Sequence, residues 1–233
     1  MGQTWDWLQA ADQHTVIVRM TPENGPAILM VTEAGMVGGK GMNSLGLGVC
    51  LNATSIGRGA TGVPLHVIYR MILNSDTVSN ALDKVAHSQR AGSGTFNIGS
   101  GSGFLMSVEF TPDNFDVLMP EHDVLIHTNH YLSDLFRAQD TFKRDLTDTF
   151  VRLNRLQRLD RAKNSAYEMK DLLAFFSDHA NYPDSVCSHE DPEDPPGKRL
   201  CSVYAVVMDL TERVLWVTDG SPCSGKFIEL GFE

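Results

Sequence analysis

Short apolar segments separated by turn-forming residues dominate the chain, and this pattern predicts a protein built mainly of β-strands. His14–Met20 (HTVIVRM) and Ala27–Ala34 (AILMVTEA) flank a turn at Pro22–Pro26 and predict a hairpin. The first residues, GQTWDW (Gly2–Trp7), are also strand-like and rich in aromatic side chains. Further predicted strands are Gly46–Thr54, Gly94–Gly99, Phe104–Thr111, Phe115–Met119, Asp123–Thr128, Cys201–Leu210 and Arg213–Thr218.

Helical periodicity is confined to two blocks that interrupt these strands. Pro64–Leu73 and Ser79–Gln89 form the first block, and Thr141–Arg161 with Lys170–Asp178 forms the second. Strands, helices, strands, helices and strands follow one another without a linker. This order predicts a single layered α+β domain over residues 1–233.

One segment between these elements has no apolar periodicity. Pro183–Pro196 combines five acidic residues with repeated prolines. Such a composition cannot bury enough apolar surface to order a segment, so we expect an exposed, mobile loop.

Composition excludes several classes of partner. The 233 residues include 19 Lys+Arg and 29 Asp+Glu, which gives a net charge of −10, so a nucleic-acid partner is not expected. No apolar run approaches the roughly 20 residues that a membrane-spanning helix requires, so no membrane association is expected either. The four cysteines are too few and too scattered for a disulfide scaffold, and no signal peptide is recognisable. A cytoplasmic location is the expectation.

Two glycine-rich stretches invite a phosphate-binding interpretation. Gly92–Gly103 lacks the Lys-Ser/Thr that follows a Walker loop, and its spacing differs from the dinucleotide-binding fingerprint. In the second stretch Lys40 follows Gly39, but no Ser or Thr comes directly after the lysine. Turns between short strands explain both stretches better, and no nucleotide cofactor is predicted.

Metal ligation is weakly indicated at two places. His127 and His130 form one histidine pair, and Cys187 with His189 forms a second possible pair of ligands. Neither pair has a third ligand at a recognisable spacing, so the sequence predicts no metal site.

Four arginines recur at every third position in the second helical block: Arg152, Arg155, Arg158 and Arg161. Such a stripe is more often a solvated, ion-paired helix face than a binding site, and we interpret it in that way.

Three polar residues stand out by their position. Asp6 lies between two tryptophans, and burial there would raise its pKa unless a cation or hydrogen-bond donors keep it ionised. Asn129 follows the apolar run Val124–Ile126, and Arg199 precedes the strand Cys201–Leu210. Strand ends around a pocket are common places for functional side chains, but spacing alone favours structural hydrogen bonding as the interpretation of all three.

Five motifs that occur in order give the chain a family resemblance. They are GQTWDW (Gly2–Trp7), TEAGMVGGKGMNSLGLGVCLNA (Thr32–Ala53), TGVPLHVIYR (Thr61–Arg70), HTNHYL (His127–Leu132) and NYPDSVC (Asn181–Cys187). Together they resemble the isopenicillin-N acyltransferase family, the acyl-coenzyme A:6-aminopenicillanic acid acyltransferases and their hydrolase relatives. The resemblance extends over nearly the whole chain.

The resemblance implies a four-layer αββα N-terminal nucleophile hydrolase. In this fold a precursor cuts itself before a cysteine, whose thiol becomes the nucleophile and whose α-amine acts as the base, without a cofactor. By the same resemblance, Asp6 orders the site, Asn129 donates to the oxyanion, and Arg199 pairs with Asp6 or with a substrate carboxylate.

The chain departs from the family pattern at its start, because the nucleophilic cysteine is expected upstream of Met1. None of Cys50, Cys187, Cys201 and Cys223 occupies its position. We therefore expect an N-terminally truncated domain that lacks its first strand and whose partner is the missing segment of its own precursor. The parent protein would act on a small amide or acyl substrate, for which the β-alanyl amides used by animal relatives are a model. The alternative is a non-catalytic remnant that binds a small ligand or a partner.

Overall fold

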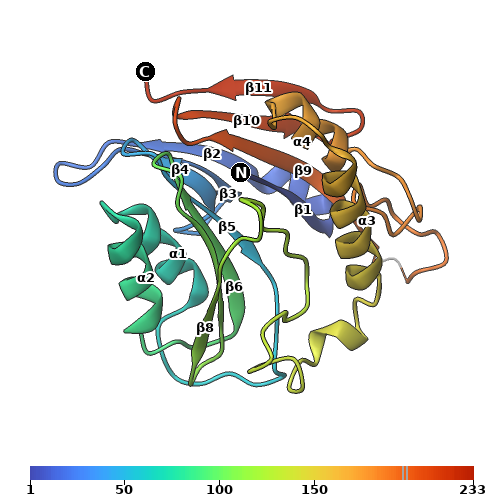
Figure 1. Cartoon of the computed structure of the whole chain (residues 1–233), viewed down its shortest axis with the longest axis horizontal. Coiled ribbons are helices and arrows are strands. Elements are labelled where there is room, and N and C mark those ends of the chain that lie inside the picture. Colours follow the sequence, from blue (N-terminus) through green and yellow to red (C-terminus); the bar gives the residue numbers. More distant parts are fainter. Residues whose placement is uncertain (196, 198) are drawn as a thin grey trace.

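The computed structural model describes residues 1–195, 197 and 199–233. Its strands form two antiparallel sheets packed face to face (Figure 1). One sheet has four strands in the order β1–β9–β10–β11, and the other runs in sequence order from β2 to β8. The strands are β1 (Gly2–Leu8), β2 (Thr15–Met20), β3 (Ile28–Glu33), β4 (Lys40–Asn43), β5 (Leu47–Asn52), β6 (Gly94–Ser100), β7 (Leu105–Phe110), β8 (Phe115–Leu118), β9 (Leu200–Asp209), β10 (Val214–Asp219) and β11 (Lys226–Leu230).

Helices cover the outer faces of both sheets. The pair α1 (Leu65–Leu73) and α2 (Val78–Ala86) packs on the seven-stranded sheet, while α3 (Asp148–Ala162) and α4 (Met169–Phe176) lie on the side of the four-stranded sheet (Figure 1). Two 3-10 turns, Gln9–His14 and Phe142–Arg144, complete the regular structure of the described residues. Among these residues, no helix is both long and apolar enough to cross a lipid bilayer.

Three apolar cores separate the four layers. The first lies between α1, α2 and the seven-stranded sheet, the second between the sheets, and the third between the four-stranded sheet and α3 and α4. On β9, Val206 and Met208 face the second core while Ala205 and Val207 face the third. Burial on both faces explains why β9 is a continuous apolar run rather than an alternating one. The αββα architecture expected from the sequence is confirmed.

The structure differs from the sequence-based elements at three strands. Lys40–Asn43 (β4) and Lys226–Leu230 (β11) are additional strands, the first short and glycine-containing and the second half-exposed, so neither shows apolar alternation. Asp123–Thr128 is not a strand beyond a single bridge between Glu121 and Val124. Its apolar side chains line a cavity instead of packing within a sheet.

The acidic loop is only partly the exposed segment that its composition predicts. Ser185 and Cys187 are fully buried, and Val186 packs in the third core. The prolines and acids that follow, from Pro192 to Pro195, are exposed, whereas Pro196 lies outside the described residues. The small and apolar residues at the start of the segment therefore anchor it against β9 and α4.

Candidate active site

A cavity of about 1210 Å³ lies against the first strand and includes every residue from Met1 to Leu8 in its lining. β1 pairs with β9 on one side, and in the described part of the chain it is the edge strand of its sheet. Residues 123–129, the start of α3 and the side of α4 form other walls. The volume exceeds the roughly 300–1,000 Å³ typical of small-molecule sites.

Asp6 faces this cavity from an irregularity in β1. The register with β9 shifts between Trp5 and Asp6, and a bulge of this kind re-aims a side chain out of the regular alternation. One carboxylate oxygen of Asp6 accepts a hydrogen bond from Ser202 Oγ at 2.6 Å. Burial raises the pKa of Asp6, and the charge of Arg152 and the Ser202 hydroxyl oppose that rise. The desolvation expected for this carboxylate is therefore present.

Arg152 of α3 is the cation beside Asp6. Its guanidinium lies 3.9 Å from the Asp6 carboxylate, donates to Asp148 at 2.5 Å and donates to the Asn129 side-chain oxygen at 3.0 Å. The side chain is buried, so these charge-assisted contacts are poorly screened. Arg152 thereby joins the two residues, Asp6 and Asn129, that the sequence singles out.

The interpretation of the arginine stripe as a solvated, ion-paired helix face is wrong for its first member, Arg152. Arg152 is buried, and Arg155 forms a two-pronged pair with Asp178, whereas Arg158 and Arg161 are exposed. Three residues turn an α-helix by about 300°, so each arginine lies about 60° behind the one before. Over the nine residues from Arg152 to Arg161 this angular offset around the helix axis adds up to about 180°, which places the two arginines on opposite faces of α3.

Asn129 has an amide whose orientation is determined by its neighbours. Because a guanidinium only donates, the atom that accepts from Arg152 must be the amide oxygen. The amide nitrogen therefore lies on the other side, where it donates to the Ala53 carbonyl at 3.2 Å. A second N–H on that nitrogen remains for the cavity, whose wall includes Asn129.

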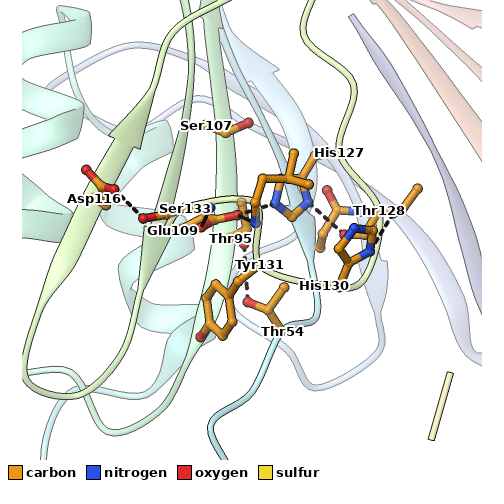
Figure 2. A network of polar contacts seen from close by, with 12 residues as sticks. Thr54, Thr95, Ser107, Glu109, Asp116, His127, Thr128, His130, Tyr131 and Ser133 are labelled. Atoms are coloured by element: carbon orange, nitrogen blue, oxygen red, sulfur yellow. Dashed lines mark hydrogen bonds and ion pairs between the residues drawn. The ribbon is translucent and has the colours of Figure 1, made fainter. Parts of the chain in front are cut away.

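A buried polar network holds the segment that carries Asn129 (Figure 2). Glu109 of β7 accepts from His127 Nε2 at 2.8 Å and from the backbone N–H groups of Leu132 and Ser133 at 2.7 and 3.0 Å. The other ring nitrogen of His127 faces the Thr128 carbonyl at 2.7 Å. Both ring nitrogens thus lie within hydrogen-bond distance of an acceptor oxygen, which holds the His127 ring on two sides.

A second set of contacts joins this segment to α3. Thr149 Oγ1 accepts from the Asn129 backbone N–H at 2.7 Å and lies 2.9 Å from His130 Nδ1. Burial, followed by the charge of His127, lowers the pKa of His130 to about 4, which keeps the ring neutral. His127 and His130, considered above as metal ligands, instead fix the backbone on either side of Asn129.

Arg199 does not pair with Asp6, so this part of the expectation is wrong, whereas its contact with a substrate carboxylate stays a prediction. Its guanidinium donates to the backbone carbonyls of Asp194 and Pro192 at 3.0 and 2.9 Å, within the acidic segment. The β1–β9 register explains the separation, because Asp6 pairs with Ser202, three residues beyond Arg199. Three residues of strand span about 10 Å.

Comparisons with known proteins agree with this architecture. The family model described as acyl-coenzyme A:6-aminopenicillanic acid acyl-transferase matches residues 1–223. The chain belongs to this acyltransferase family. The 40 kDa form of acyl-coenzyme A:6-aminopenicillanic-acid-acyltransferase from Emericella nidulans is 27% identical over 223 residues, which cover 95% of this chain and 61% of that protein. The chain therefore spans about three-fifths of the length of this curated relative.

Solved structures confirm the N-terminal nucleophile hydrolase fold. Penicillin V acylase from Agrobacterium tumefaciens superposes with a TM-score of 0.64 at 13% identity, covering 99% of this chain and 81% of that one. An N-acylethanolamine-hydrolyzing acid amidase orthologue from Caenorhabditis elegans gives 0.57 at 14% identity, with 90% and 87% covered. A mutant conjugated bile acid hydrolase from Clostridium perfringens gives 0.56 at 10% identity, with 99% and 92% covered.

One further buried charge near the site of this acyltransferase-family chain has no signal in the sequence. Lys40 of β4 lies between the sheets, with its Nζ 3.3 Å from the Trp5 ring centroid and 3.5 Å from Tyr204 Oη. Burial lowers the pKa of Lys40 to about 7. A lysine in a glycine-rich stretch is ordinarily a turn residue, and only the pairing of β3 and β4 reveals that its side chain is buried.

Proposed function

We propose that the protein is an amide hydrolase or acyltransferase that acts on a small acyl-amine substrate through a cysteine nucleophile. The observation that carries this proposal is the chain of contacts from Asn129 through Arg152 to Asp6 on the wall of one cavity, in a member of the acyltransferase family. Acyl transfer needs a donor aimed at the developing oxyanion and a charge that orders the nucleophile. Asn129 and Asp6 have the chemistry for these two roles.

The cysteines of this chain do not supply the nucleophile in this proposal. Burial raises the pKa values of Cys50 and Cys201 each to about 11, so these two thiols stay protonated and weakly nucleophilic at neutral pH. Cys187 is not among the residues that line the cavity. Cys223 is exposed in the turn before β11. In this proposal the nucleophile comes from another segment.

We assign that role to a segment of a precursor that precedes Met1. The edge of β1 opposite β9 lies along the cavity and offers backbone groups to an added strand. A strand paired there would run past Asp6 and bring a cysteine to the end of the cavity that Asn129 faces. The length of the curated relative, of which this chain spans 61%, is consistent with additional sequence.

The proposed reaction follows from these groups. The thiol transfers its proton to the α-amine of the same cysteine and attacks the substrate carbonyl carbon. Asn129 donates its remaining amide N–H to the oxyanion of the tetrahedral intermediate. The C–N bond breaks, the amine leaves with the proton, and water or an acceptor amine then takes the acyl group from sulfur. No cofactor takes part in these steps.

The test uses the protein expressed with its preceding segment. Self-cleavage before a cysteine is measured by mass spectrometry, and turnover is measured with three amides: a β-alanyl amide of a biogenic amine, an N-acylethanolamine and penicillin V. We expect turnover of at least one amide, reduced about 10²- to 10³-fold by Asn129→Ala. The exposed Arg158→Ala serves as the matched control.

Two results would refute the proposal: a self-cleaved protein that turns over no amide, or Asn129→Ala with full turnover. If residues 1–233 alone are folded and bind these amides while the longer protein is inert, the non-catalytic alternative holds instead.

A further inference from the structure

Four potential metal ligands converge at the edge of the cavity, and one of them, His189, belongs to its lining. The ligand atoms of His179, Cys187, His189 and Cys223 all lie within 4.8 Å of one another. They come from three segments: the residues just after α4, the start of the acidic segment, and the turn between β10 and β11. The cluster thus joins parts of the chain that are distant in sequence.

Three of the six distances between ligand atoms lie close to the edges of a small tetrahedron, and all six are at most 4.8 Å. The two histidine Nε2 atoms are 3.0 Å apart, and His189 Nε2 is 3.7 Å from the sulfur of Cys187 and 3.7 Å from that of Cys223. With zinc bonds of about 2.0–2.1 Å to nitrogen and about 2.3 Å to sulfur, a tetrahedral site has N–N edges of about 3.3 Å and N–S edges of about 3.6 Å. Shifts of a few tenths of an ångström would bring these three distances to the tetrahedral values, and the other three start from at most 4.8 Å.

We propose that these four side chains bind one Zn²⁺ ion. Two thiolates and two imidazoles are a donor set that favours zinc in a tetrahedral site over magnesium or calcium. Four protein ligands fill the tetrahedral shell and leave no position for water or substrate, so the site is structural. It is separate from the cysteine chemistry proposed above and does not depend on it.

The surrounding contacts position the ligands. Ser221 Oγ lies 3.4 Å from the Cys187 sulfur and 3.5 Å from the Cys223 sulfur. Ser177 Oγ donates to the Pro222 carbonyl at 3.0 Å, which holds the end of α4 against the β10–β11 turn. These contacts bring the three segments together before any ion binds.

A second layer of contacts reaches α3. The Cys187 backbone N–H donates to the Asp178 carbonyl at 3.0 Å, and the Asp178 carboxylate is paired with Arg155. Outer contacts of this kind orient metal ligands and raise affinity. Because α4, Val186 and His189 line the cavity, a zinc ion here would also hold one wall of the candidate active site.

The sequence showed only half of this site. His179 lies ten residues before His189, and Cys223 lies 34 residues after it. Neither interval belongs to a recognised zinc motif, so Cys187 and His189 had no visible third ligand and the sequence-based expectation of no metal site followed.

The test measures zinc directly in residues 1–233, purified with reductant and without chelator. Elemental analysis should find one zinc per folded chain, and replacement by Co²⁺ should give the thiolate charge-transfer and intense d–d bands of tetrahedral coordination. Even changes outside the ligand shell cost about 10- to 100-fold in metal affinity. Accordingly, His179→Ala and Cys223→Ser should each lower the zinc content by at least roughly tenfold at limiting zinc.

Matched control variants distinguish the loss of a zinc ligand from a general loss of stability. His87→Ala changes an exposed histidine on α2's C-terminal side, and Cys201→Ser keeps a hydroxyl where the thiol donates to Gln9, so both should retain zinc. A chelator should lower the Tm of the wild-type chain and leave that of Cys223→Ser unchanged. Folded wild-type protein without stoichiometric zinc or a tetrahedral cobalt spectrum would overturn the proposal, as would a Cys187–Cys223 disulfide in the reductant-purified chain.

Discussion

Arg152 donates a hydrogen bond of 3.0 Å to the side-chain oxygen of Asn129, although 23 positions separate the two residues. This contact decides which end of the amide faces the cavity. It also places a buried positive charge between Asn129 and Asp6, so that one side chain on α3 orients a donor and stabilises a carboxylate. The first two predictions follow from this relationship.

Replacing Arg152 should disorder the Asn129 amide without removing it. In the self-cleaved protein we expect Arg152→Met to lower kcat by about 10²-fold, approaching the loss of an oxyanion donor, while Arg152→Lys restores only part of the rate. Steady-state kinetics measure the effect, and Arg158→Met on the exposed face of α3 is the control. Equal kcat values for Arg152→Met and the control would contradict this positioning role.

Asp6→Asn should separate stability from activity. The folded-state pKa of Asp6 is raised, so its ionised form costs stability above that pKa, and the cost disappears as pH falls through it. The variant should therefore match or exceed the wild-type free energy of unfolding at pH 7, with a difference that shrinks near pH 3. Turnover should fall by at least about 10²-fold. Urea unfolding at pH 7 and pH 3 measures the stability difference between Asp6→Asn and the wild type. A variant much less stable than the wild type at pH 7 would refute the prediction.

The lowered pKa of His130 predicts that the protein loses stability in mild acid. Its pKa is lowered to about 4 from the ordinary histidine value of 6.5, so between these pH values the unfolded chain binds the additional proton. The free energy of unfolding should fall as pH drops through this window, by up to about 3 kcal/mol. His130→Gln should flatten that part of the profile, whereas the exposed His87→Gln should not. Parallel wild-type and His130→Gln profiles would show that His130 is not the group responsible.

Lys40→Met tests the lysine between the sheets. Burial disfavours the ammonium and lowers its pKa to about 7 from the ordinary lysine value of 10.5, so stability rises as pH increases between these two values. The cation–π contact with Trp5 offsets about 2 kcal/mol of the free-energy cost of burying the ammonium. At pH 6 we expect Lys40→Met to increase the free energy of unfolding by about 1–3 kcal/mol, against no change for the exposed Lys84→Met. Chemical denaturation measures it, and a destabilised Lys40→Met would show that the contacts with Trp5 and Tyr204 outweigh the burial.

The strands that the sequence predicts well are those with strong apolar patterning, such as β3 and β9. β4 was missed because it has only four residues, one of them a glycine, and β11 because it is an edge strand with exposed side chains. The segment 123–128 has the composition of a strand, but its side chains form a cavity wall and its end, at His127 and Thr128, contacts β7 and α3. The local sequence pattern could not distinguish a strand from a cavity wall, because both bury apolar side chains.

The sequence by itself determined the family and, through the motifs of that family, the αββα layering, because ordered motifs are properties of the chain alone. It also predicted Asp6 and Asn129 as site residues, and the structure places both on the wall of one cavity. Only the tertiary structure decided that Arg152, and not Arg199, accompanies Asp6, and that His179 and Cys223 join Cys187 and His189. The physical reason is the same in both cases. An ion pair or a metal site forms only between side chains whose charged or ligand atoms lie about 3–4 Å apart. Strand register, helix rotation and the packing of distant turns decide which side chains come this close, and the spacing of residues along the sequence does not determine them.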